Sequence, residues 1–184
     1  MIKVLGIDPG YTSFAASLIS FDEDGGRKHL ETYFHKFPPP PNKKLNLKSA
    51  FVINIRIEEI FNEIRELIER TFPNAVGIEA YNPIPGRTSS AGKLIAAVTA
   101  AKCGIMATGM RPIEFGASDL RHSILGCAKG TKEEIWDAVA KIYPIDAFPP
   151  VHKDDVQHLR DSRAIAEVAL REVIDREKMV RGSF

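Results

Sequence analysis

The sequence predicts an α/β fold built on a mixed β-sheet, with its first three strands antiparallel and helices on both faces. Three observations support this prediction. Three strand-like segments follow one another at the start of the chain, a long amphipathic helix comes next, and short apolar strands then alternate with helices. The 184 residues are enough for a sizeable core, and we expect a single domain spanning 1–184.

Composition narrows the class of protein. Hydrophobic residues make up 44% of the chain and charged residues 27%, as in ordinary globular proteins. No apolar run approaches the roughly 18 residues of a membrane span, and the N-terminus lacks the apolar region of a secretion signal. We therefore expect a cytoplasmic protein of a prokaryote, or of the host cell if the chain is viral. Cys103 and Cys127 are too few for a disulfide framework. The net charge of +1 does not decide whether nucleic acid is a partner, so any DNA contact must come from a local patch.

The first predicted strand ends on an acidic residue. Residues 2–10, IKVLGIDPG, are mainly apolar and β-branched before Asp8, and Pro-Gly then turns the chain. A buried, ionised Asp is costly unless it is hydrogen-bonded, paired or bound to metal. Asp8 therefore either organises a hairpin turn or belongs to a site. Residues 14–21 and 29–37 are the next strands of the meander.

A second carboxylate stands in an equivalent position. Apolar residues recur at helical spacing over 47–71, which predicts a long helix covering one sheet face. The segment 75–79 follows as a short buried strand that ends on Glu79. Open α/β sheets place their sites at the carboxyl ends of strands. Two acids placed this way, on strands far apart in sequence, indicate a site more strongly than either alone.

Four further elements are predicted before the last helix. They are a helix from Ser89 or Ser90 to about Cys103, a strand at 112–115, a short helix capped by Ser118 and ending near 125, and a helix at 132–143. In the helix at 132–143, Trp136 is expected on the core face rather than stacked on a base.

The last predicted helix runs from about Asp154 to about Arg176, before a charged tail. On it Asp154, His158 and Asp161 stand at i, i+4 and i+7, on one face. Two acids and an imidazole on a shared face can meet a single ion. For Asp154 the alternative is a helix N-cap, with Gln157 three residues later.

Three acids and a histidine thus stand on three predicted elements: Asp8, Glu79, His158 and Asp161. Mg²⁺ prefers oxygen ligands, and two such ions roughly 4 Å apart can clamp the attacking and leaving oxygens of phosphodiester hydrolysis. No cysteine ligand set, Walker loop or dinucleotide fingerprint competes with this interpretation. We therefore expect these residues to be both ligands and catalytic groups of a two-Mg²⁺ site, in which Mn²⁺ can substitute.

At these residues the chain resembles the RuvC-type Holliday junction resolvases of the ribonuclease-H-like, or retroviral-integrase, superfamily. GIDPG at 6–10 matches the family's opening motif, GIE at 77–79 looks like its second acidic strand, and HLRDSRA at 158–164 resembles its closing helix. The resemblance implies a ribonuclease-H-like sheet and a crossover junction endodeoxyribonuclease of DNA recombination and repair. It also implies a homodimer acting on four-way DNA, because symmetric nicking needs two sites related by a two-fold axis.

The resemblance further implies residues that bind DNA. Arg121 and Lys132 stand where RuvC-like enzymes carry basic residues near the scissile phosphate, and Arg87 is a further candidate. Tyr81 lies one residue before the family's aromatic position, which is Asn82 here. Tyr81 either stacks on an unpaired base or packs under the proline-containing loop.

Two other functions stay open at the level of sequence. The same fold and metals could cut other branched DNA or RNA–DNA hybrids. Alternatively, the chain could be a junction-binding module without a nuclease centre, although the presence of all four candidate ligands argues against it.

Overall fold

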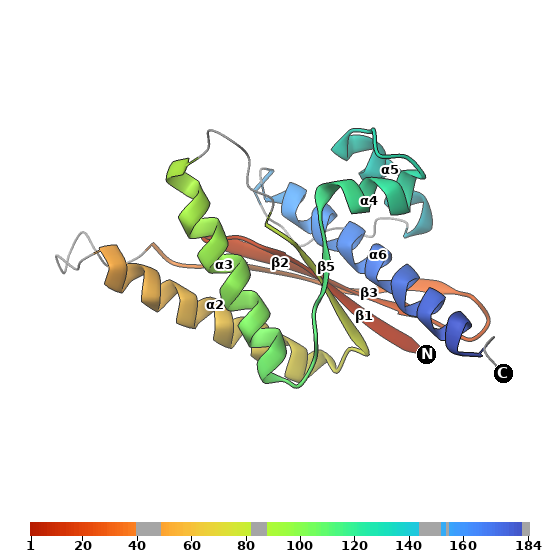
Figure 1. Cartoon of the computed structure of the whole chain (residues 1–184), viewed down its shortest axis with the longest axis horizontal. Coiled ribbons are helices and arrows are strands. Elements are labelled where there is room, and N and C mark those ends of the chain that lie inside the picture. The colour runs from red at the N-terminus through yellow and green to blue at the C-terminus, as the bar shows by residue number, and fades with distance from the viewer. Residues whose placement is uncertain (40–48, 82–87, 144–151, 154, 182–184) are drawn as a thin grey trace.

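The computed structural model describes residues 1–39, 49–81, 88–143, 152–153 and 155–181. These residues form one five-stranded sheet with helices on both faces (Figure 1). None of the helices in the described ranges is long and apolar enough to cross a membrane. In chain order the elements are β1 (Ile2–Pro9), β2 (Ser13–Phe21), β3 (Arg27–Lys36), α2 (Ser49–Thr71), β4 (Ala75–Glu79), α3 (Thr88–Ala107), β5 (Ile113–Phe115), α4 (Ala117–Leu125), α5 (Lys132–Ile142) and α6 (Val156–Arg181).

The sheet is mixed, with the order β3-β2-β1-β4-β5. β2 pairs antiparallel with both β1 and β3, whereas β4 pairs parallel with both β1 and β5. The predicted antiparallel meander of three strands is therefore confirmed, and so is the mixed α/β fold. Parallel pairing of β1 with β4 brings the carboxyl ends of both strands to the same edge of the sheet.

Each face of the sheet packs against its own helices. Side chains alternate along a strand, so Leu5 and Ile7 of β1 enter the core formed with α2 and α3, while Val4 enters the core formed with α4, α5 and α6. Figure 1 shows α2 and α3 side by side, with α4 and α5 next to α6. The predicted coverage of both faces is confirmed.

Two paired glycines let α6 lie very close to the sheet. Gly6 of β1 and Gly77 of β4 are direct neighbours in the parallel register. A Cβ atom on Gly6 would lie 2.3 Å from the backbone N of Ala166 and 2.3 Å from the carbonyl O of Ser162. Both contacts are with helix backbone, so side-chain rotation could not relieve them. Glycine is required at this position for α6 to approach the strand.

The close approach positions the start of α6 over the strand ends. Asp8 and Glu79 follow the two glycines by two residues, so they lie on the sheet face that carries α6. A buried hydrogen bond of 2.9 Å between the Oγ atoms of Ser17 and Ser162 also ties α6 to β2. The N-terminal turns of α6 are thereby held against the edge where β1 and β4 end.

Several helix boundaries differ from the predicted ones. Helix α3 begins at Thr88, so Ser89 and Ser90 lie within it and neither is its N-cap. The prediction that Ser118 caps α4 is wrong: Gly116 is the N-cap, and its backbone N donates to the Asp119 carboxylate at 2.8 Å. Helix α3 runs four residues past Cys103, its predicted end, because Gly104 does not end the helix but packs against α2. A Cβ at Gly104 would lie 2.7 Å from the carbonyl O of Phe61, so this glycine allows α3 to lie against α2.

Helix α6 also continues beyond its predicted end, to Arg181. Its charged last turns contain ion pairs at helical spacing, between Arg176 and Glu172 and between Lys178 and Asp175. Such pairs stabilise exposed helix turns by about 0.2–0.5 kcal/mol each. The charged segment is therefore compatible with a helix rather than a frayed tail.

Candidate active site

The site is built first from the ends of the two parallel strands. Ile7 pairs with Ile78, so Asp8 and Glu79 are the next residues on their strands. The Asp8 side chain is only 9% exposed. Burial and then the negative charges of Asp8 and Asp161 raise the pKa of Glu79 to about 7. The two predicted acids are thus brought close enough to repel one another.

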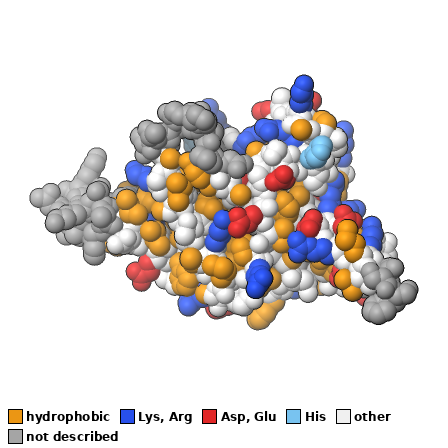
Figure 2. All heavy atoms as spheres, viewed as in Figure 1, with side chains coloured by type: hydrophobic (Ala, Val, Ile, Leu, Met, Phe, Trp, Pro, Cys, Tyr) orange, Lys and Arg blue, Asp and Glu red, His pale blue; other side chains and the backbone are white. Residues whose placement is uncertain are grey.

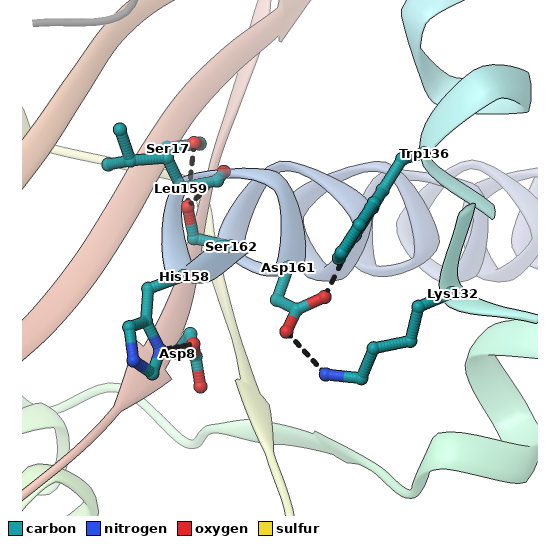
Figure 3. A network of polar contacts seen from close by, with 8 residues as sticks. All are labelled: Asp8, Ser17, Lys132, Trp136, His158, Leu159, Asp161 and Ser162. Atoms are coloured by element: carbon teal, nitrogen blue, oxygen red, sulfur yellow. Dashed lines mark hydrogen bonds and ion pairs between the residues drawn. The ribbon is translucent and has the colours of Figure 1, made fainter. Parts of the chain in front are cut away.

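Helix α6 adds His158 above Asp8. The Nδ1 atom of His158 lies 2.6 Å from Oδ2 of Asp8. Figure 3 shows the His158 ring pointing toward the Asp8 carboxylate. This hydrogen bond raises the pKa of His158, outweighing the burial that lowers it. The protonated imidazole is therefore favoured, with Nδ1 donating to the carboxylate.

Asp161, one turn further along α6, is held by two residues of α5. The Lys132 ammonium donates to Oδ2 of Asp161 at 2.6 Å, and the Trp136 indole N–H donates to Oδ1 at 3.0 Å (Figure 3). Lys132 and Trp136 are at i and i+4, on one face of α5. A capping box fixes the start of this helix, with Thr131 N donating to the Glu134 carboxylate and Glu134 N donating to Thr131 Oγ1.

Lys132 remains charged in this setting. Burial lowers its pKa, but the hydrogen bond to Asp161 and the charges of Asp161, Glu79 and Asp8 together raise it above the ordinary value. The ammonium group offsets part of the negative charge of the three carboxylates. Its charge lowers the pKa of Glu79, against burial and the charges of Asp8 and Asp161, which raise it.

These side chains open into one cavity of about 680 Å³. It is lined by the ends of β1 and β4 and by residues of α3, α4, α5 and α6. The lining residues are Asp8, Pro9, Gly10, Glu79, Ala80, Tyr81, Leu94, Val98, Ala117, Lys132, Gln157, His158 and Asp161.

The donor set of this cavity fits a hard divalent cation. Three carboxylates from β1, β4 and α6 converge on it, and after burial the charges of Asp8 and Asp161 contribute to the raised pKa of Glu79. Within the described residues, no three carboxylate, imidazole or thiol side chains are grouped as a ready-made metal site. Asp161 is paired with Lys132, and Asp8 with His158.

The remaining candidates fall into three groups. Tyr81 lines the cavity. Arg121 is not among the described residues that line it, and its Nε donates instead to the carbonyl O of Gly130 at 3.0 Å, in the turn before α5. Arg87 and Asp154 lie outside the described residues, so the structure does not test either of them.

Trp136 has a contact that sequence reasoning missed. Its ring packs partly against the core formed with α6, as its helical position predicts, but its N–H binds Asp161. The four-residue spacing from Lys132 was the available signal, because it puts both side chains on one face of the helix.

The relatives found by comparison with known proteins carry the same name. No protein-family model matches the chain. The crossover junction endodeoxyribonuclease RuvC of Xanthomonas euvesicatoria is 29% identical over 140 residues, covering 76% of this chain and 74% of the relative. The protein of the same name from Treponema denticola is 25% identical over 157 residues, covering 83% and 79%.

Solved structures match the fold across most of the chain. The Thermus thermophilus RuvC structure, also solved in complex with a Holliday junction substrate, has a TM-score of 0.71 at 22% identity, covering 91% of this chain and 92% of that one. The yeast mitochondrial Holliday junction resolvase Ydc2 has a TM-score of 0.59 at 13% identity, covering 91% and 78%.

A mixed sheet with acids at the ends of β1 and β4, facing a last helix with a further acid, is the arrangement expected of a ribonuclease-H-like fold. The overall fold matches that of the solved RuvC structures. The sequence of the chain is similar to the RuvC-type Holliday junction resolvases over about three quarters of the chain or more, at 29% identity or less.

Proposed function

We propose that this protein is a structure-selective endodeoxyribonuclease that resolves four-way DNA junctions by paired, metal-dependent phosphodiester hydrolysis. The observation that carries the proposal is the convergence of Asp8, Glu79, His158 and Asp161 on one cavity, next to a charged lysine. These four residues are the proposed catalytic groups and metal ligands. The likeness to RuvC proteins over about three quarters of the chain supports the same activity.

The three carboxylates would hold Mg²⁺, with Mn²⁺ as a substitute. Bound there, two such ions supply electrostatic stabilisation of the attacking and leaving oxygens. The residues themselves provide the anionic oxygens and fix their positions through β1, β4 and α6. His158 must release the Nδ1 proton that it shares with Asp8 before that nitrogen can act as a ligand.

Two cavity residues are suited to hold DNA. Lys132 is paired with Asp161, and we propose that it turns to a phosphate when Asp161 binds a cation. Tyr81 lies in the cavity lining beside the acids, where an opened base of a junction could stack on its ring. Contacts of Arg121 and Arg87 with the DNA backbone remain predictions.

Paired nicks require two copies of the site, so we propose that the protein acts as a homodimer. Exposed apolar side chains of α3 support an association surface, because Leu94, Ile95 and Met106 are 39%, 46% and 54% exposed. Figure 2 shows hydrophobic side chains gathered over the part of the molecule that α2 and α3 form. Sedimentation equilibrium at micromolar concentration should give twice the chain mass.

One cleavage experiment separates the candidate functions. A mobile four-way junction, a flap, a linear duplex and an RNA–DNA hybrid are each incubated with Mg²⁺, with Mn²⁺ and with chelator. We expect symmetric nicks in the junction with either metal, and none with chelator. Equal cutting of the linear duplex would contradict junction selectivity, preferred cutting of the hybrid would favour a different substrate class, and binding without cleavage would indicate a non-catalytic module.

Replacing each strand-end acid by its amide tests whether Asp8 and Glu79 are needed for cleavage. Asp8→Asn and Glu79→Gln each remove an anionic ligand while keeping side-chain size, so cleavage should be abolished and junction binding largely retained. Near-normal Mg²⁺-dependent nicking by either variant would remove that residue from the proposed site.

A further inference from the structure

We propose that Trp136 is a positioning residue for the cation site: its indole N–H holds Oδ1 of Asp161, so that Oδ2 is the oxygen presented to a metal ion. This inference rests on the proposed metal-dependent function. It concerns a side chain that has no place of its own in the cavity, since Trp136 is not among the described residues that line it.

The two donors on Asp161 differ in charge, and this difference assigns their roles. Lys132 binds Oδ2 as an ammonium group, whereas Trp136 binds Oδ1 as a neutral donor. A divalent cation that approaches Asp161 repels Lys132 but has no charge to repel on the indole. The Trp136 bond can therefore persist when the lysine leaves, and it keeps the carboxylate from rotating.

The indole is itself held firmly in place. Trp136 packs partly against the core between α5 and α6, and the guanidinium of Arg160 lies 5.0 Å from its ring centroid. Such a cation–π contact favours one orientation of the ring. A donor clamped on two sides restricts the carboxylate more than a flexible lysine can. Partners that orient a metal ligand in this way typically change metal affinity by about 10- to 100-fold.

The first test is cation binding without any DNA. Isothermal titration of the full-length protein with Mn²⁺ should give a Kd about 10-fold weaker for Trp136→Phe, which keeps an aromatic ring but removes the N–H. Tyr143→Phe is the matched control: it removes a ring donor from a different carboxylate, the buried Glu167, to which Tyr143 donates at 2.7 Å. Its Kd should equal that of the unaltered protein. An unchanged Kd for Trp136→Phe would overturn the inference.

A double-variant cycle shows whether Trp136 acts through Asp161. In an Asp161→Ala background, adding Trp136→Phe should leave the Kd for Mn²⁺ unchanged, because the oxygen that the indole holds is absent. The same fold-loss in both backgrounds would mean that Trp136 has only a general structural role, and would contradict the inference.

The unaltered protein provides a measurement that does not depend on how the variants fold. Trp136 is the single tryptophan of the chain, so all indole emission comes from beside the proposed site. Titration with Mn²⁺ should quench this emission with the calorimetric Kd, and Asp161→Ala should lose the transition. Emission that stays constant at saturating Mn²⁺ would overturn the inference. Cation binding without junction cleavage would instead contradict the proposed function and leave the role of Trp136 intact.

Discussion

Replacing Gly6 by alanine tests how α6 is held against the sheet. The added Cβ would lie 2.3 Å from two backbone atoms of α6, whereas ordinary contact begins near 3.4 Å. The helix must therefore move by about 1 Å. Overpacking of this kind costs about 1–3 kcal/mol of unfolding free energy. For a chain of this length, each kcal/mol lowers the Tm by about 2–4 °C, so we expect a fall of about 2 to 12 °C.

The same displacement should affect catalysis more than stability. His158 and Asp161 are carried by the part of α6 that Gly6 positions, and a shift of about 1 Å in a reacting group can cost about 100-fold in rate. Urea unfolding and Mg²⁺-dependent nicking of a four-way junction measure the two effects on the same preparation.

Gly92→Ala is the matched control for this variant. Gly92 is an exposed residue of α3, and a Cβ there would meet nothing within 4 Å. Alanine is the better helix former, so this change should stabilise the protein by about 0.5–1 kcal/mol and leave nicking unchanged. If Gly6→Ala unfolds at the same urea concentration as the unaltered protein, close backbone packing is not what positions α6.

Three further predictions follow from the cavity. Because the folded-state pKa of Glu79, about 7, exceeds its ordinary 4.5, metal-free stability should fall as pH rises from about 4.5 to 7. Glu79→Gln should remove about 1–3 kcal/mol of this decline. Thermal unfolding of both proteins in chelator at pH 5.5 and 8 measures the difference. If both proteins lose the same stability between the two pH values, the assigned pKa is contradicted. Lys132→Ala should lower the salt slope of junction binding by about one unit, measured by fluorescence anisotropy, and an unchanged slope would place Lys132 outside the DNA footprint. Tyr81→Ala should reduce the signal of a fluorescent base analogue at the crossover more than it reduces affinity, whereas an identical signal would exclude base stacking.

The architecture could be predicted because local patterns and chain order agree. Runs of apolar, β-branched and aromatic residues separated by turn residues mark the first three strands, and the helical spacing of apolar residues marks α2. Asp8 and Glu79 could be nominated because each ends a buried strand. The close packing of α6 was harder to predict, since it depends on Gly6 and Gly77 being neighbours in a parallel pair 71 residues apart in sequence.

Other features depend on tertiary contacts that leave no local trace. A serine two residues after a glycine is a reasonable N-cap by composition, yet Gly116 takes that position because Asp119 returns to its backbone N. A glycine near the expected end of α3 looks like a stop signal, but Gly104 faces α2 and lets the helix continue. The spacing of Trp136 from Lys132 puts both side chains on one face of α5, but only the packing of α5 against α6 makes Asp161 their shared partner.

The order of the site residues along the chain has a consequence for protein synthesis. Asp8 is made early, but its hydrogen-bond partner His158 follows 150 residues later. At about 5–20 residues per second, a ribosome needs about 8 to 30 s to cover that distance. Throughout this interval the growing chain lacks the helix that would complete the cavity, so a nascent or prematurely ended chain has no assembled centre with which to cut the DNA around it.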